Sequence, residues 1–213
     1  MVSGAGLVLA VVLIIFGVYF NDRYAFAQDN VRTQLSEQKI FFPEKSQMAP
    51  DELKQPGVVK YAGQAVDNGD KAQVYANEYI GLHLKHIADG TPYAGKTYAE
   101  LGGPQFAIQD KLTTAQTAGS ADVANLQKQL DQIKGIRNTL FTGETLRGLL
   151  LTTYGFWTFG QEAHLAMVAS FAGAGVLFLL VGLGMFHAVR SGRRGTDASP
   201  ASAPAVEKIP ELV

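Results

Sequence analysis

The side chains with the clearest potential for chemistry are two histidines three residues apart, His83 and His86. On a helix this spacing places both imidazoles on one face, and Glu78 and Glu162 could add carboxylate ligands to a metal ion. However, a zinc protease needs His-Glu-x-x-His, whereas a leucine and a lysine separate these histidines and the lysine would repel a cation. We therefore expect surface or core histidines and no metal site. A metal-dependent envelope enzyme or sensor using His83 and His86 is the alternative.

Motifs for nucleophilic catalysis and phosphate binding are missing from the sequence. There is no Gly-x-Ser-x-Gly segment, and Gly102-Gly103-Pro104 is not followed by the lysine and hydroxyl residue of a phosphate loop. Because the sequence has no cysteine, disulfides, thiolate metal sites and cysteine nucleophiles are excluded. The net charge of −1, without a basic face, also argues against nucleic-acid binding. The sequence thus favours a non-enzymatic protein without a cofactor.

Two apolar segments without charged side chains lie near the ends of the sequence, at residues 6–20 and 165–186. As a helix the second would extend about 33 Å, which is enough to cross the hydrocarbon core of a bilayer. It is followed by Arg190, Arg193 and Arg194, and the positive-inside rule then predicts a cytoplasmic C-terminal end. We expect a cell-membrane protein with an extracytoplasmic central domain and a cytoplasmic tail.

The first apolar segment has two interpretations. Ala25-Phe26-Ala27 resembles a signal-peptidase site, which would make the segment a cleaved signal. Against cleavage, no lysine or arginine precedes the apolar run, and Tyr19, Phe20 and Tyr24 are suited to the membrane interface of a retained helix. We favour a retained anchor, and both interpretations place the central domain outside the cytoplasm.

The second apolar segment is rich in small residues that recur every four positions. Such a face lets another helix approach closely, which promotes association in lipid. We expect it to pack against the first segment, although a membrane-protein partner or a second copy would use the same surface. The predicted packing residues are Ala166, Ser170 and Ala174, with Ala169 and Gly173 beside them.

The region between the apolar segments is predicted to be helical, because alternating strand-like runs are few. Residues Asp29 to Gln38 should continue the first helix out of the membrane, and the proline-containing stretch from Phe41 to Gly57 predicts an extended connection. Asn68 is suited to cap a helix that runs from Asp70 to Ile87 and is closed by Gly90.

A further helix is predicted to begin at Asp122. Its apolar residues follow a heptad-like spacing too short for a coiled coil, so we expect this face to pack against the helix at residues 70–88. The glycines, prolines and small polar residues of Thr91–Pro104 and Thr113–Ser120 predict mobile loops. The apolar residues concerned are Val123, Leu126, Leu130 and Ile133.

Aromatic residues are concentrated just before the second apolar segment. The stretch from Leu146 to Phe159 is too short, and too interrupted by Arg147 and two glycines, to span a membrane alone. We expect it to lie at the membrane interface, where Arg147 would contact lipid headgroups or pair with Glu144. The predicted interface aromatics are Tyr154, Phe156, Trp157 and Phe159.

The predicted fold class is all-α, with two transmembrane helices flanking a helical extracytoplasmic domain. The anchor comprises residues 1–27, the extracytoplasmic domain 28–142, the aromatic interfacial segment 143–163, and the second transmembrane helix 164–188. The tail, residues 189–213, is rich in Ala, Ser and Pro, a composition that predicts disorder.

Several stretches resemble a poorly characterised family of actinobacterial two-span membrane proteins with a helical exterior domain. They are Lys60-Tyr61-Ala62-Gly63-Gln64, Tyr75-Ala76-Asn77, His83-Leu84-Lys85, and Gly143-Glu144-Thr145-Leu146-Arg147-Gly148-Leu149-Leu150-Leu151 through Tyr154 to Trp157. The resemblance covers most of the chain except the tail, and implies the two-span topology and a high-G+C Gram-positive source. Members are sometimes labelled aromatic ring-opening dioxygenases, which are soluble enzymes with an iron-ligand set that this sequence does not show.

The leading hypothesis is therefore a cell-envelope membrane protein that acts as an accessory or scaffold subunit of a membrane complex. Its expected partners are the lipid bilayer and a membrane protein or a second copy.

Overall fold

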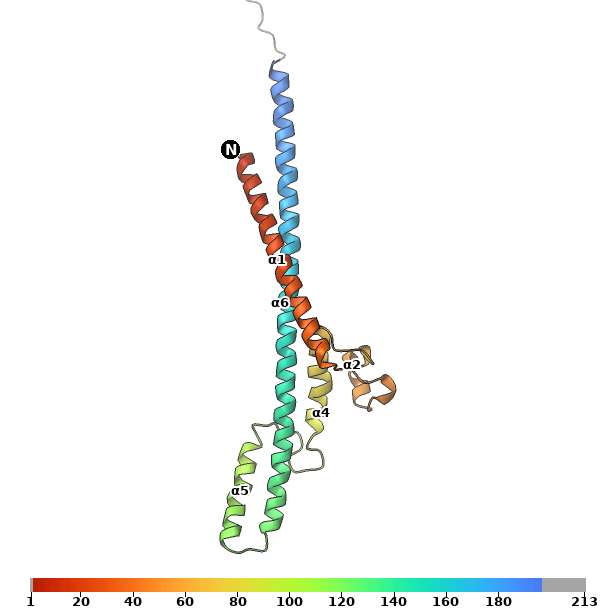
Figure 1. Ribbon diagram of the computed structural model, residues 1–213, viewed down its shortest axis with the longest axis vertical. Coiled ribbons are helices and arrows are strands. Elements are labelled where there is room, and N and C mark those ends of the chain that lie inside the picture. Colours follow the sequence, from red (N-terminus) through yellow and green to blue (C-terminus); the bar gives the residue numbers. More distant parts are fainter. Residues whose placement is uncertain (1, 197–213) are drawn as a thin grey trace, which may run out of the picture. The chain divides into compact units, whose positions relative to one another are not determined.

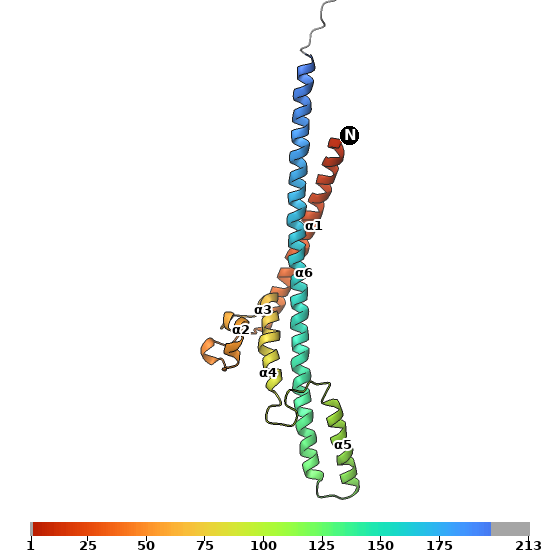
Figure 2. The ribbon, with the colours of Figure 1, turned by 180° about the vertical axis from the view of Figure 1, so that it is seen from behind.

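The computed structural model describes residues 2–196, which form helices and the connections between them (Figures 1 and 2). Within that range no strand occurs, and Phe41 and Ala65 form an isolated antiparallel β-bridge. The all-α prediction is confirmed for this part of the chain. The chain divides into two compact units. We call residues 2–20 with 165–196 the apolar pair, and Asn21–His164 the central unit.

Two long helices pass through both units, α1 (Val2–Gln38) and α6 (Val123–Thr196). Both are long and apolar enough to cross a membrane. α6 is continuous through the predicted interfacial segment, since Gly148 and Gly155 do not interrupt it. It continues to Thr196 and thus includes the first part of the predicted tail, whereas residues 197–213 lie outside the described range.

In the apolar pair, small residues allow α1 and α6 to approach closely. Ala10 and Ala174 are buried, and a Cβ atom added to Gly17 would lie 2.7 Å from the ring of Phe171. Ser170 is also buried, and its hydroxyl donates a hydrogen bond to the Ala166 carbonyl over 2.7 Å. This bond satisfies a polar group that would otherwise be costly in an apolar environment.

In the central unit, α1 buries Ala27, Val31 and Leu35, which recur every four residues along one helical face. The helix ends at Gln38, and Lys39 adopts a left-handed conformation with φ of 53°. The predicted continuation of the first helix to Gln38 is thus confirmed.

The connection that follows is less extended than the prolines predicted. It contains two single 3-10 turns, at Lys45–Gln47 and Glu52–Lys54, and the short helix α2 at Pro56–Lys60. Proline at the start of α2 fits its fixed φ and missing N–H. Backbone bonds from Phe42 to Gln64 and from Val66 to Ile40, both 2.9 Å, fold this stretch back on itself.

The predicted helix after Asn68 is present in three parts. α3 (Gly69–Val74) is followed by a π-helical turn, η3 (Tyr75–Ile80), and then by α4 (Gly81–His86). The Asn68 side chain accepts a hydrogen bond from the Lys71 amide over 3.0 Å, which confirms the predicted N-cap. No sequence pattern predicted the π-helical turn.

The expected loop at Thr113–Ser120 is wrong for most of its length, because α5 runs from Gly102 to Thr117. α5 and the first part of α6 form a hairpin, lying side by side in both views (Figures 1 and 2). The apolar face of α6 after Asp122 was expected to pack against the helix at residues 70–88. It packs mainly on α5 instead, and of the α4 side chains only Leu84 joins it. We call this the hairpin cluster: Leu101, Ile108, Leu112, Leu130, Ile133 and Leu140.

A second cluster forms where α1, α3, η3 and α6 meet the folded connection. Its largest members are Phe42 and Trp157, and a Cβ atom on Gly69 would lie 2.3 Å from the Trp157 side chain. The close approach of α3 to α6 therefore requires glycine at that position. We call this the Phe42 cluster: Val31, Leu35, Phe42, Met48, Val58, Val66, Ala72, Ala76, Leu150 and Trp157.

Candidate functional site

Of the side chains considered as metal ligands, Glu162 is exposed, whereas Glu78, His83 and His86 have separate partners. Glu78 accepts a hydrogen bond from the Gly57 amide over 2.7 Å, at the start of α2. His86 Nδ1 lies 2.7 Å from a carboxylate oxygen of Asp89. Among the described residues no group of three or more His, Asp or Glu side chains is arranged to hold a metal ion. These contacts assign Glu78 and His86 local structural roles.

His83 instead pairs with a carboxylate that the sequence did not single out. Its Nε2 atom lies 2.7 Å from Oε1 of Glu52, and the other carboxylate oxygen accepts the Ala49 amide over 2.7 Å. Glu52 is only 5% exposed, whereas the His83 side chain is about half exposed. Both Glu52 oxygens are therefore satisfied, as a buried carboxylate requires. Glu52 lies between Pro50 and Pro56, in a connection without helical or strand periodicity. No sequence pattern therefore indicated that its carboxylate would be buried.

Two tyrosines extend this pair into a row of rings in tilted contact. Tyr75, Tyr79 and His83 are four residues apart, and their ring centroids are separated by 4.7 Å and 4.5 Å. Tyr75 also meets Phe42 edge to face at 5.2 Å. Burial, with smaller contributions from Tyr79 and Glu52, raises the pKa of Tyr75 to about 12. Burial chiefly raises the pKa of Tyr79 as well, so both rings are neutral at physiological pH.

A hollow of about 470 Å³ opens beside this row. Its lining combines the Glu52–His83 pair with Asp51, His86 and apolar side chains. An imidazole oriented by a carboxylate is suited to transfer a proton, but catalysis of acyl transfer also needs a nucleophile. The lining residues include no serine, threonine or cysteine hydroxyl or thiol: they are Ala49, Asp51, Glu52, Leu82, His83, His86 and Ile87. The lining therefore lacks the hydroxyl or thiol nucleophile that an acyl-transfer triad requires.

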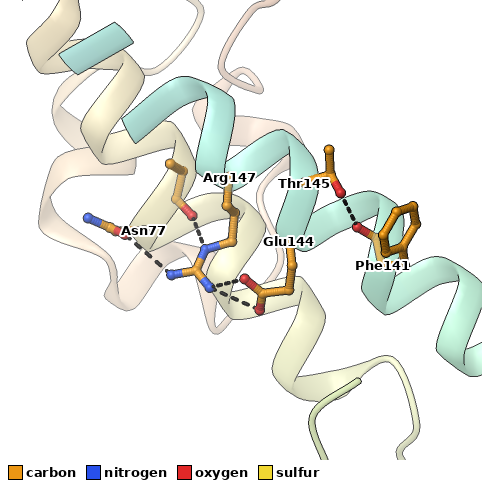
Figure 3. A network of polar contacts seen from close by, with 6 residues as sticks. Asn77, Phe141, Glu144, Thr145 and Arg147 are labelled. Atoms are coloured by element: carbon orange, nitrogen blue, oxygen red, sulfur yellow. Dashed lines mark hydrogen bonds and ion pairs between the residues drawn. The ribbon is translucent and has the colours of Figure 1, made fainter. Parts of the chain in front are cut away.

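Arg147 forms the second polar centre of the central unit (Figure 3). Its Nε donates to the Ala76 carbonyl over 3.0 Å, and Nη1 reaches both carboxylate oxygens of Glu144, at 2.8 and 3.0 Å. Nη2 lies 3.4 Å from the Asn77 side-chain oxygen. Of the two expected contacts of Arg147, the pairing with Glu144 is present. A π-helical turn shifts the helical hydrogen-bond pattern, and Arg147 bonds a carbonyl in that turn.

The predicted interface aromatics differ in exposure. Trp157 is 8% exposed because its ring belongs to the Phe42 cluster, and Tyr154 is partly buried. Phe159 is 71% exposed, and Phe156 is exposed with its ring edge to face with Phe26 at 6.0 Å. Of the four predicted interface aromatics, Phe156 and Phe159 are therefore the two with exposed side chains. Contact of these residues with lipid stays a prediction.

The small residues predicted to pack helices also differ. Gly173 approaches the Leu13 side chain, at 3.2 Å from an added Cβ atom, and Ser170 and Ala174 are buried. Ala169 is exposed and Ala166 half-buried. The structure thus places Ser170, Gly173 and Ala174 within the apolar pair. Ala169 stays available to another helix.

No protein-family model, curated protein or solved structure matches this chain. The resemblance to an actinobacterial two-span family therefore stays a prediction, and the function has to be argued from the residues themselves.

Proposed function

We propose that this chain is an integral membrane protein of the cell envelope that acts as an accessory or scaffold subunit of a membrane complex. Its central unit is extracytoplasmic, and its C-terminal end is cytoplasmic. The proposal is supported by two long apolar helices and by an exposed apolar face on α6. No arrangement of catalytic side chains among the described residues favours an enzyme.

The surface of the apolar pair supports a membrane location. A core helix of a soluble protein buries its apolar side chains, yet Val8, Leu179 and Leu183 all lie exposed on these helices. Exposed apolar side chains over such lengths are stable in contact with lipid tails rather than with water. The arginines that follow the second segment favour the proposed orientation.

Retention of the first helix is supported by packing inside the central unit. A Cβ atom on Gly160 would lie 2.8 Å from the Cβ atom of Ala27. Cleavage after Ala27 would remove this residue together with the preceding part of α1. Tyr24, whose ring centroid lies 4.8 Å from that of His164, would be lost as well. An intact amino terminus in the mass spectrum of the membrane-extracted protein is the expected result.

The observation that carries the accessory role is an exposed apolar face on α6 within the central unit. Phe141, Leu149, Phe156 and Phe159 are eight, seven and three residues apart, which places them on one side of the helix. Leu149 is 62% exposed, and no charged residue occurs from Gly148 to Gln161. Contiguous apolar surface of this kind marks a site of protein or membrane contact. We assign it to a membrane-protein partner.

Affinity purification from gently solubilised membranes tests this assignment. A partner protein should co-purify in stoichiometric amount with the tagged wild type and be lost from L149S/F159S. The matched control is Phe106→Ser, which removes a side chain that is 67% exposed on a different helix, α5. Recovery of the chain alone, or an equal yield of partner with L149S/F159S, would contradict an accessory role. Recovery of only a second copy would reassign the face to self-association.

The proposed orientation can be tested separately. Because the chain has no cysteine, a single cysteine introduced at Gln127 or at Ser202 reports on its surroundings without background labelling. A membrane-impermeant maleimide added to intact cells should label Q127C and not S202C. Labelling of S202C alone would reverse the orientation.

A further inference from the structure

A second hollow, of about 310 Å³, lies where α4, the connection before α5, and α6 meet. Its polar lining comes from four separate segments of the central unit, and it does not overlap the exposed face of α6. The polar residues are Asn77, Lys85, Lys96, Thr97, Glu144 and Arg147.

The charges that line this hollow are unbalanced. Three cations stand against one carboxylate, and that carboxylate, Glu144, is bound by Arg147. Lys85 and Lys96 form no ion pair with any described residue. Outside the hollow, the carboxylate of Glu100 interacts electrostatically with Lys96. Hydrogen bonds from Thr97 chiefly hold the pKa of Glu100 below its usual value, and Lys96 makes a smaller contribution. The lining therefore carries two excess positive charges.

Arg147 and the connection that carries Lys96 are held in place by other contacts. Arg147 is bonded to the Ala76 carbonyl and to Glu144 (Figure 3), so its charge is fixed at the edge of the hollow. The connection that carries Lys96 is fixed as well. The amide and hydroxyl of Thr97 both donate to Glu100 over 2.8 Å, and Arg137 lies over the Tyr98 ring at 4.2 Å from its centroid. The backbone that carries Lys96 and the Arg147 side chain therefore need little ordering when a ligand binds.

We propose that this hollow binds a phosphate group through Lys85 and Lys96, within the field of Arg147. Two excess positive charges match the charge of a phosphate monoester, and lysine ammonium groups bind phosphate oxygens with charge-assisted hydrogen bonds. The volume holds a phosphate with a small organic substituent. The site is independent of the accessory role proposed above, because it uses none of the residues of the exposed α6 face.

The phosphate can come from a soluble ester or from a lipid headgroup. Arg147 lies seventeen residues before His164 on the same helix, which corresponds to about 25 Å at 1.5 Å per residue. This distance from the end of the central unit favours a soluble source.

Calorimetric titration of the full chain in a phosphate-free detergent, with inorganic phosphate as the probe, tests the site. K85Q/K96Q should bind phosphate about tenfold more weakly or worse, because two charge-assisted contacts are lost. The matched control K128Q/K134Q removes the same charge from exposed positions on α6 that do not line the hollow, and it should bind as the wild type does. Absence of saturable binding by the wild type, or equal weakening in both double variants, would overturn the proposal.

A second arm separates the two sources. The wild type and K85Q/K96Q are reconstituted in nanodiscs of anionic phospholipid and titrated again. A soluble ligand predicts that wild-type affinity is unchanged from that in detergent. A headgroup in the site predicts that added phosphate no longer binds to the wild type, and that lipid phosphorus remains with the wild type but not with K85Q/K96Q after extraction. Either result assigns phosphate chemistry to the hollow.

Discussion

The Phe42 cluster draws its residues from α1, α2, α3, η3, α6 and two connections, whereas the hairpin cluster is built almost entirely by α5 and the first part of α6. The first cluster also adjoins a buried carboxylate, Glu52, and the close approach of Gly69 to Trp157. The second contains aliphatic residues at helical spacing. Contacts between distant segments have to form together, while a hairpin of two neighbouring helices forms locally. We therefore expect the two clusters to unfold separately and to respond differently to substitution.

Trp157→Ala should have the largest effect, about 3–5 kcal/mol, because it removes a large ring from the Phe42 cluster. Hydrogen exchange in detergent measures the effect at the amides of Val66 and Ala72, which are hydrogen-bonded within that region. Amides of the hairpin, such as that of Ile133, should keep their protection. Phe159→Ala is the control, since its exposed ring makes little packing contribution. Equal losses at both clusters would show that they unfold as one.

Leu112→Ala should give the opposite pattern at a somewhat smaller cost of about 2–4 kcal/mol. Leu112 is buried between α5 and α6, so exchange should accelerate in the hairpin and stay slow at Val66. Leu112→Met, which conserves the volume, should cost less than about 1.5 kcal/mol. Loss of protection at Val66 in the alanine variant would contradict local unfolding of the hairpin.

Glu52→Ala should destabilise the Phe42 cluster by about 1–3 kcal/mol, because the Ala49 amide loses its acceptor and His83 loses its partner. His83→Ala should cost less, since its side chain is half exposed. A double-mutant cycle should find coupling of about 0.5 kcal/mol or more between the two sites. The exposed Glu37→Ala is the control. Purely additive effects of E52A and H83A on the unfolding free energy would show that the contact between Glu52 and His83 does not stabilise this region.

The smallest effect at neutral pH concerns Tyr75, whose pKa is raised to about 12 by burial. The folded state then holds the phenolic proton more tightly than the unfolded state, in which tyrosine titrates near 10. The stabilisation is complete below pH 10 and is lost as pH rises from 10 towards 12. Denaturant unfolding followed by the fluorescence of Trp157, the single tryptophan, should show this decline.

Tyr75→Phe should reduce the decline in unfolding free energy over that pH range and leave the hairpin cluster unaffected. An unchanged pH dependence in the Tyr75→Phe protein would mean that another group is responsible.

Much of the fold could be predicted from local patterns. Uncharged length identified the two apolar helices, and Asn68 and Gly90 marked the beginning and end of a helical segment that the structure confirms. The helix at Gly102–Thr117 was missed because glycine and proline at its start and threonines near its end are poor helix formers. Its apolar residues Ile108 and Leu112 are buried only because α6 packs against them. Tertiary packing there overrides weak helix propensity.

The candidate sites depended more strongly on contacts between distant residues. The sequence by itself determined which segments are apolar, where helices are capped, and that His83 is on a helix, because those properties depend on neighbours within a few residues. Only the tertiary structure decided that Glu52 pairs with His83, that Arg147 bonds the Ala76 carbonyl, and that Lys85 and Lys96 share a hollow. Periodicity tells which face of a helix packs, but it carries no information about which distant segment meets that face.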